Sequence, residues 1–212
     1  TASLTIGEGC TALGEQFFTC GTYNDESGMW HYYNDETAVT LPKSLRSIGE
    51  YAFQGRLGLR EIDLGQVETL GKSCFAYTGL VDIRVPGTVK EIPDSAFANC
   101  ADAMTITLEE GVEAVREYAF AEDGRKENMP RGMWNWVLNA EQAQKAGDRI
   151  TANGANPAYD NFLVIRLPST LKEIDGYSFC WIYIQGLYLE WCQSPDMLPP
   201  FATDAFSGGP RT

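Results

Sequence analysis

Apolar and polar positions recur along this chain with a period of about 22 residues. Segment 83–97 shows the unit as IRVPGTVKEIPDSAF: two alternating apolar residues, a proline or glycine, two apolar residues three apart, and a small residue before a phenylalanine. The same phase recurs in segments 4–18, 39–53, 62–75, 106–120 and 165–179, with a longer, modified closing copy in 187–206. Phe53, Phe75, Phe97 and Phe120 follow one another at spacings of 22, 22 and 23 residues. The pattern predicts a solenoid of about seven repeats.

The residues of one repeat predict its local structure. The alternation at Ile83 and Val85 predicts a short strand with one buried face. A proline or glycine ends the strand, since proline cannot donate a hydrogen bond to a neighbouring strand. The next apolar pair returns the chain to the core, where Phe97 places a large ring beside the small Ala96. Because one repeat cannot bury this core alone, the repeats must stack with parallel strands. We expect a repeat solenoid with one strand per repeat of about 22–23 residues and short turns or helical segments on the other side.

Two insertions interrupt the period. Phe18 and Phe53 are 35 residues apart, and Phe120 and Phe179 are 59 apart, which predicts extra residues at about 21–38 and 122–161. The second insertion contains 134–147, whose apolar residues are spaced to line one face of a helix. We therefore expect a single domain over 1–212 with these two insertions and a C-terminal cap at about 187–212.

The repeats resemble a known family. LPKSLRSIGEYAF, VPGTVKEIPDSAFANC and LPSTLKEIDGYSFC are similar to the unit IxLPxSLxxIGxxAFxxCxxL of the BspA-like leucine-rich repeat family, and PPFATDAFSG resembles its closing half-repeat. The resemblance covers nearly the whole chain except the insertions. It implies a leucine-rich repeat superhelix of a secreted or cell-surface protein, common in Bacteroides-type bacteria, with roles in adhesion and binding of host or partner-cell proteins. The family places a buried thiol just after the phenylalanine, where Cys20 and Cys100 stand and where Cys180 is a third candidate; the other copies lack it.

Composition excludes several further classes of function. The chain has 29 acidic against 16 basic residues and a net charge of −13, so it would repel a nucleic-acid backbone. A single histidine, His31, excludes multi-histidine metal sites and most histidine-based catalysis. Adjacent carboxylates such as Glu109 and Glu110 are what any acidic surface provides, so a glycan-processing enzyme is the weakest alternative. No apolar run approaches the roughly 18–20 residues that span a bilayer. We expect no catalysis, no cofactor, no nucleic-acid partner and no transmembrane segment.

The charge is unevenly distributed. Residues 1–42 hold six acids and no lysine or arginine, residues 43–100 hold seven of each, and residues 101–161 hold eleven acids against six bases. An electrostatically steered partner would therefore be basic and would meet the N-terminal insertion or the fifth repeat.

The cysteines are interpreted mainly as packing residues. Cys10 falls in an apolar column of the repeat and Cys74 in its small-residue column, where a thiol packs as a small hydrophobe. A disulfide between Cys180 and Cys192 is the alternative. A catalytic thiol is disfavoured because no histidine lies in any repeat to activate it.

The insertions carry the candidate binding residues. These are aromatic residues that the solenoid core does not need: Trp30, Tyr32, Tyr33, Trp134 and Trp136. Aromatic residues on loops often anchor protein interfaces and carbohydrates; the alternative is that they close a small core within each insertion. The phrases YNDES and YNDET supply four carboxylates of the kind that calcium prefers, Asp25, Glu26, Asp35 and Glu36, although their spacing matches no EF-hand. The alternative there is a solvated hairpin-like excursion with acidic turns.

The outward positions of the predicted strands form a second candidate surface. One column is Thr5, Thr40, Asp63, Arg84, Thr107, Arg166 and Tyr188, and its neighbour is Ser3, Ala38, Glu61, Asp82, Thr105, Val164 and Gly186. This mixed polar face is either a solvated sheet, with cross-strand pairs such as Asp63 with Arg84, or a protein-binding surface.

We therefore expect a non-enzymatic, extracellular or cell-surface interaction protein, an adhesin-like scaffold that binds a protein ligand such as a host extracellular or surface protein. No signal or anchor is recognised in the sequence. The alternatives are a carbohydrate-binding surface module that uses the insertion aromatics, and a structural spacer within a larger surface protein.

Overall fold

The computed structural model describes residues 2–24, 29–31, 37–100, 102–121, 162–179 and 186–191, of which 22–24, 29–31, 162–164 and 186–191 are described as backbone only. The expected helix in 134–147, most of the second insertion and the greater part of the C-terminal cap lie outside these residues.

The first of two rows of strands consists of the longer ones. Its members are β1 (Ala2–Thr5), β5 (Thr37–Thr40), β8 (Asp82–Val85), β10 (Thr105–Leu108), β12 (Phe162–Leu167) and β14 (Gly186–Trp191). β1 pairs with β5, and the other four form one sheet in the order β14-β12-β10-β8, with every pair parallel. This is the parallel stacking that the repeat pattern predicts.

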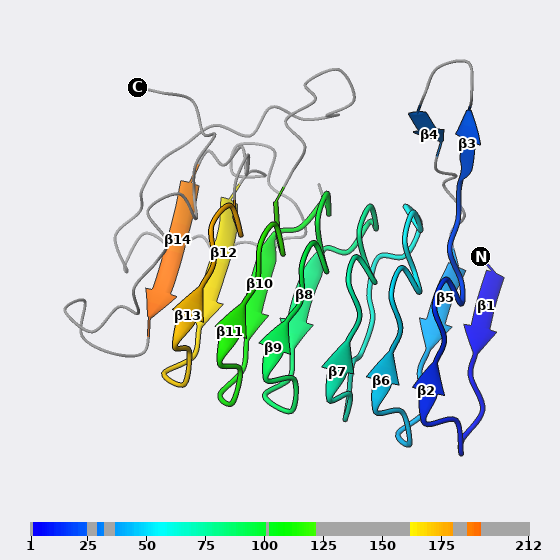
Figure 1. Ribbon diagram of the computed structural model, residues 1–212, viewed down its shortest axis with the longest axis horizontal. Coiled ribbons are helices and arrows are strands. Elements are labelled where there is room, and N and C mark those ends of the chain that lie inside the picture. The colour runs from blue at the N-terminus through cyan, green and yellow to red at the C-terminus, as the bar shows by residue number, and fades with distance from the viewer. Residues whose placement is uncertain are drawn as a thin grey trace, which may run out of the picture.

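The second row consists of two-residue strands that run the opposite way along the molecule (Figure 1). Its members are β2 (Ala12–Leu13), β6 (Ser47–Ile48), β7 (Thr69–Leu70), β9 (Glu91–Ile92), β11 (Ala114–Val115) and β13 (Glu173–Ile174). They pair in parallel as β2-β6-β7 and β9-β11-β13. The side opposite the long strands is therefore built from turns and very short strands, with no helix among the described residues. The predicted repeat solenoid is confirmed.

The core between the two rows is a column of phenylalanine rings. Its members are Phe53, Phe75, Phe97, Phe120 and Phe179, each at most 4% exposed. Neighbouring rings lie 5.2–5.4 Å apart between centroids and within 7° of parallel. Ile83 and Val85 of β8 are buried against them while Asp82 and Arg84 are exposed, as the alternation predicts.

Two backbone requirements shape the turn that precedes each phenylalanine. The residue two positions before the ring adopts a left-handed conformation with φ between 53° and 59° in all six described copies: Gln16, Tyr51, Ser73, Ser95, Tyr118 and Tyr177. The glycine that starts this turn in the second and third copies is packed against backbone, because a Cβ on Gly71 would lie 2.3 Å from the Glu50 nitrogen.

The structure corrects the predicted strand alignment in two places. Arg166 pairs with Glu190 and not with Tyr188, which lies beside Val164. The two-residue shift keeps the same side chains on the same face, so the apolar pattern alone does not exclude it. In the third copy, 61–63 forms no strand; instead Asp63 Oδ1 accepts a hydrogen bond from the Gly65 nitrogen at 2.9 Å, a local turn that competes with strand pairing.

The first insertion contains an antiparallel hairpin, formed by β3 (Thr22–Asn24) and β4 (Met29–His31), which extends beyond the solenoid at its N-terminal end (Figure 1). A hairpin-like excursion is one of the two structures expected for this stretch. Among the described residues, no helix is long and apolar enough to cross a membrane.

The described cysteines occupy packing positions. Cys74 is fully buried, and this burial raises the pKa of its thiol well above the usual range, as for a cysteine packed in an apolar core. Cys100 is also buried, and its Sγ lies 3.2 Å from Thr78 Oγ1. Cys10 is a free thiol packed at the edge of the core, and Cys20 is half-buried. Cys180 and Cys192, the alternative disulfide, lie outside the described residues.

Candidate binding surface

The outward face of the long-strand row is the first candidate surface. In β8 and β10 the register places Asp82 beside Thr105 and Arg84 beside Thr107, and the next strand adds Arg166 beside Thr107. All five side chains are exposed or half-exposed. The buried residues that alternate with them fix the strands against the phenylalanine column, so the polar side chains project from a rigid support.

Local hydrogen bonds organise this face. Thr105 Oγ1 donates to Asp82 Oδ1 at 2.5 Å, and Arg84 Nη1 pairs with Glu109 Oε1 at 3.0 Å. The expected cross-strand pair of Asp63 with Arg84 is wrong, because Asp63 is engaged in its own turn. The face offers hydrogen-bond donors and acceptors of both charges, which suits recognition of polar protein surface.

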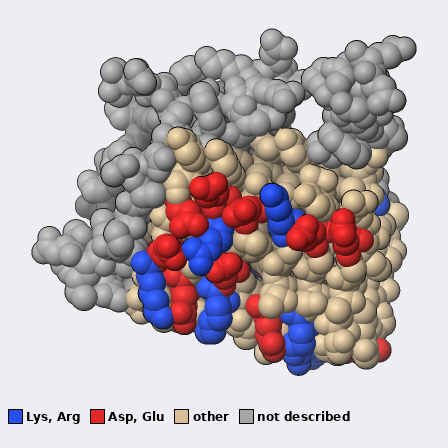
Figure 2. Space-filling model, in the orientation of Figure 1, with Lys and Arg blue, Asp and Glu red and all other residues tan. Residues whose placement is uncertain are grey.

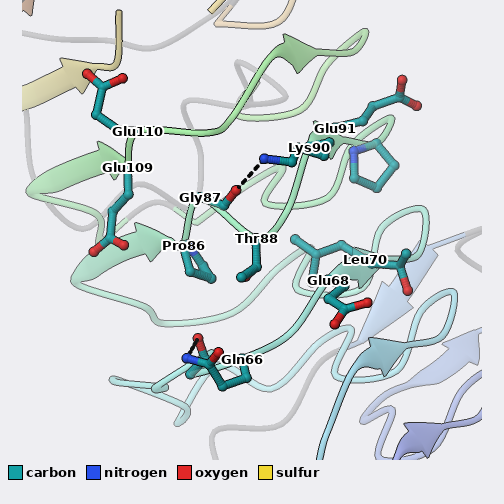
Figure 3. A pocket seen from close by; sticks show the side chains of 13 residues that line it. Gln66, Glu68, Leu70, Pro86, Gly87, Thr88, Lys90, Glu91, Glu109 and Glu110 are labelled. Carbon is teal, nitrogen blue, oxygen red and sulfur yellow. Dashed lines mark hydrogen bonds between the residues drawn. The ribbon is translucent and has the colours of Figure 1, made fainter. Parts of the chain in front are cut away.

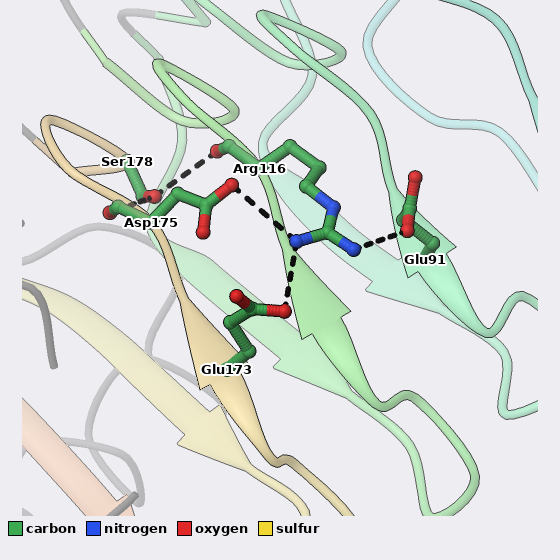
Figure 4. A network of polar contacts seen from close by, with 5 residues as sticks. All are labelled: Glu91, Arg116, Glu173, Asp175 and Ser178. Atoms are coloured by element: carbon green, nitrogen blue, oxygen red, sulfur yellow. Dashed lines mark hydrogen bonds and ion pairs between the residues drawn. The ribbon is translucent and has the colours of Figure 1, made fainter. Parts of the chain in front are cut away.

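The opposite face, along the short-strand row, carries a network of charges centred on Arg116 (Figure 4). Arg116 Nη2 lies 2.5 Å from Glu91 Oε2, and its Nη1 lies 2.9 Å from Glu173 Oε2 and 3.5 Å from Asp175 Oδ2. The hydrogen bond that Arg116 donates to Glu91 contributes most to raising the pKa of Arg116, which stays fully charged. Since the three carboxylates come from repeats on both sides, the guanidinium joins three successive repeats.

Other charges on the chain are paired in the same way. Figure 2 shows acidic and basic side chains interleaved on the displayed face. Lys172 Nζ lies 2.6 Å from Glu113 Oε2, and this hydrogen bond lowers the pKa of Glu113. This pair joins two successive repeats, and an exposed ion pair of this kind contributes about 0–1 kcal/mol.

A groove opens beside the turns of the third and fourth copies (Figure 3). Four carboxylates line it: Glu68, Glu91, Glu109 and Glu110. Lys90 lies within it, and its ammonium donates to the carbonyls of Gly87 and Gly111 at 3.0 and 3.1 Å. Three of the carboxylates each pair with an arginine, so the groove is close to charge-balanced. Within the described residues, no three His, Cys, Asp or Glu side chains gather to hold a metal ion.

The model of the BspA type leucine rich repeat region matches residues 27–128 with six copies. These repeats are BspA-type leucine-rich repeats. The search of curated proteins found no relative of this chain.

Three solved structures resemble the chain. A leucine rich cell surface protein from Faecalibacterium prausnitzii is 17% identical over 92% of this chain and 61% of that chain, with a TM-score of 0.30. The pneumococcal vaccine antigen PcpA is 19% identical over 89% of this chain and 55% of that chain, with a TM-score of 0.39. A leucine-rich repeat protein from Bacteroides ovatus is 16% identical over 89% of this chain and 56% of that chain, with a TM-score of 0.34. The chain thus spans 55 to 61% of the length of these proteins.

The BspA-type frame also presents aromatic residues that the sequence reasoning missed. Tyr118 and Tyr177 occupy the same left-handed position in successive copies, are 42% and 38% exposed, and stack with centroids 5.4 Å apart. Their shared place in the repeat, two residues before the buried phenylalanine, was visible in the sequence. The exposure of the two rings is not visible in the apolar pattern, since Ser73 at the same left-handed position is buried.

Most of the predicted site residues lie outside the part of the chain that the structure describes. Trp30 lies in β4, where only the backbone is described. The other predicted binding aromatics, Tyr32, Tyr33, Trp134 and Trp136, lie outside the described residues, as do the candidate calcium ligands Asp25, Glu26, Asp35 and Glu36. Their roles stay predictions.

Proposed function

We propose that this chain is a non-enzymatic, extracellular or cell-surface scaffold whose long-strand face binds a protein ligand in an adhesin-like manner. The observation that carries the proposal is the row formed by Arg84, Thr107 and Arg166, which occupy one register position in three neighbouring strands. Their side chains are exposed or half-exposed on a sheet whose other face is buried. Leucine-rich repeats that stack in this way provide an extended surface of defined shape.

The absence of catalysis is part of the same proposal. Several carboxylates, among them Glu91, Glu113 and Asp175, are paired with arginine or lysine across repeat boundaries. The buried thiol of Cys74 has a raised pKa, which is the reverse of what a nucleophile requires. Both features fit a scaffold better than an enzyme.

The experiment uses a panel of purified extracellular-matrix proteins immobilised on a surface. The variant Arg84→Glu/Arg166→Glu reverses two charges on the long-strand face, and Lys72→Glu makes the same change at an exposed position beyond the short-strand row. For a panel member that the unmodified chain binds, we expect the double variant to weaken binding at least about tenfold, equivalent to about 1.4 kcal/mol, and Lys72→Glu to leave it unchanged. Equal binding by all three proteins, or binding of no panel member, would contradict the proposal.

The insertion aromatics provide the second candidate function, a carbohydrate-binding module. Trp134 and Trp136 stand in an insertion that the repeat does not require, and tryptophan is enriched among binding anchors. A glycan array probed with the unmodified chain and with Trp134→Ala separates the two candidates: a glycan signal that the variant loses favours carbohydrate. The predicted calcium site is tested by thermal unfolding with and without a chelator. A spacer would bind nothing on either array.

A further inference from the structure

We propose that the boundary between the third and fourth repeats is a hinge that divides the solenoid into two cooperative units. We call this boundary the seam: it separates β7 (Thr69–Leu70) from β9 (Glu91–Ile92). The inference concerns the scaffold itself and does not depend on the proposed ligand-binding function.

The first observation is a missing set of backbone hydrogen bonds. At every other described boundary of the short-strand row, three amides of one repeat donate to two carbonyls of the preceding repeat. At the next boundary, for example, Glu113 and Ala114 donate to Lys90 O at 2.8 and 3.1 Å, and Arg116 donates to Ile92 O at 2.9 Å. At the seam, none of these three bonds forms among the described residues, and β7 and β9 belong to separate sheets.

The sequence supplies the first physical cause of this gap. The residue equivalent to Gly71 and Arg116 in the fourth repeat is Pro93, which has no amide hydrogen to donate to Leu70 O. The N–H groups of Lys90 and Glu91, which would pair with Glu68 O, donate to no described residue.

A difference in turn length is the second cause. The turn of the third repeat has two residues, Gly65 and Gln66, between its core positions, where the fourth has three, Pro86 to Thr88. We call this turn loose because a Cβ added to Gly65 would meet nothing within 4 Å, although Thr88 Oγ1 of the next turn donates to Val67 O at 2.5 Å. On the other side of the seam, a Cβ added to Gly87 would lie 1.7 Å from the Glu110 carbonyl oxygen. The groove of Figure 3 opens where the loose turn faces the tight one.

The long-strand row is interrupted at the same place. The segment 61–63 forms no strand, so the sheet that contains β8 ends at the seam and does not continue to β5. Both rows of strands are therefore interrupted at the seam, where the long-strand side keeps one backbone bond, from the Val81 amide to Arg60 O at 3.1 Å.

One wall of the solenoid crosses the seam intact, and it supplies the pivot. Phe75 stacks on Phe97 at 5.3 Å and 7°, as closely as the other pairs in the column. The amides of Ser73, Phe75 and Tyr77 donate across the seam to the fourth repeat at 3.1, 2.8 and 2.8 Å. A solenoid that is fully joined on one wall and held by single hydrogen bonds on the others bends about the fully joined wall. In repeat proteins, cooperativity depends on each nearest-neighbour interface, so a weak interface separates units that open independently.

The test is native-state hydrogen exchange of the whole chain in increasing urea. Two amides act as reporters: Gly71, bonded to Ile48 O at 2.8 Å on the N-terminal side, and Arg116 on the C-terminal side. We expect the free energy of opening at each amide to depend on urea concentration in its own way, so that the two reporters give two distinct dependences. Pro93→Ala restores the missing backbone N–H donor. Because proline already has a Cβ, alanine adds no new side-chain atom at this position. One added hydrogen bond of about 1 kcal/mol reduces seam opening about fivefold and brings the two dependences together.

The control makes the same substitution away from the seam. Pro42 lies in the turn of the second repeat, outside the short-strand row, so Pro42→Ala reproduces the change in unfolded-chain entropy without adding a bond at the seam. It should leave the two dependences apart. A single dependence shared by both reporters in the unmodified chain would overturn the hinge. If the two reporters differ but Pro93→Ala brings their urea dependences no closer than Pro42→Ala does, the assignment of the hinge to the seam would be overturned.

Discussion

The phenylalanine column is the feature whose energetic role can be tested most directly. Phe97 is 1% exposed and stacks on two rings, Phe75 at 5.3 Å and Phe120 at 5.4 Å. Phe97→Leu retains an apolar side chain of similar size but removes both stacking contacts. Each stacked aromatic pair contributes about 0.5–1.5 kcal/mol beyond its buried area, so we expect the free energy of unfolding to fall by about 1–3 kcal/mol. Phe97→Ala also leaves a cavity and should cost about 3–5 kcal/mol.

Urea unfolding followed by far-ultraviolet circular dichroism measures these changes. The matched control is Phe17→Leu: Phe17 is 45% exposed, and its contact with Phe53 is edge-on at 6.3 Å. A surface substitution of this kind should change stability by no more than about 0.5 kcal/mol.

A double-mutant cycle isolates the stacking from the general loss of packing. Combining Phe75→Leu with Phe97→Leu should give a coupling energy of about 0.5–1.5 kcal/mol, because the first substitution already removes their shared contact. Strictly additive effects, or an equal cost for Phe97→Leu and Phe17→Leu, would refute the view that ring stacking along the axis stabilises the solenoid.

Three further substitutions test other contacts. Arg116→Met leaves three carboxylates without their shared cation, so we expect a loss of about 1–2 kcal/mol in urea unfolding that shrinks at 1 M salt. Gly71→Ala forces a Cβ against backbone and should cost about 1–3 kcal/mol by the same measurement, whereas Gly7→Ala, with nothing within 4 Å, should cost far less. The pKa of Glu113 is lowered by Lys172, so its stabilising contribution is present above the ordinary pKa of 4.5 and disappears as the pH falls through the lowered value. Lys172→Met should return the Glu113 titration, followed by NMR, to the ordinary range.

The core could be predicted from the sequence because each buried residue repeats. Phe97, Ile83 and Val85 are buried as expected, since an apolar residue that recurs at one phase of every copy has only the shared interior to occupy. The short-strand row was not predicted. Its strands are two residues long, and positions such as Glu91 and Ile92 look the same in a strand as in a turn, because two residues are too few to show an alternation.

The departures from the repeat can be read in the sequence, but their structural consequence cannot. Pro93 stands where other copies have glycine, arginine or aspartate, and the third copy is one residue shorter in its turn. Each looks like ordinary variation within a tolerant motif. Only the stacked geometry shows that both changes fall at one boundary and remove hydrogen bonds there together.

The candidate binding surface is the part that repetition leaves undetermined. A position in the core column must satisfy the neighbouring copies, so Phe75 and Phe120 constrain what can stand at Phe97. An outward position such as Arg84 meets solvent, and threonine or a second arginine occupies its place in the next two strands without disturbing the stack. The stacking that specifies the fold therefore places no condition on the outward residues. Differences among copies at outward positions are where a ligand can be encoded, and substitution along that column measures binding with little effect on folding.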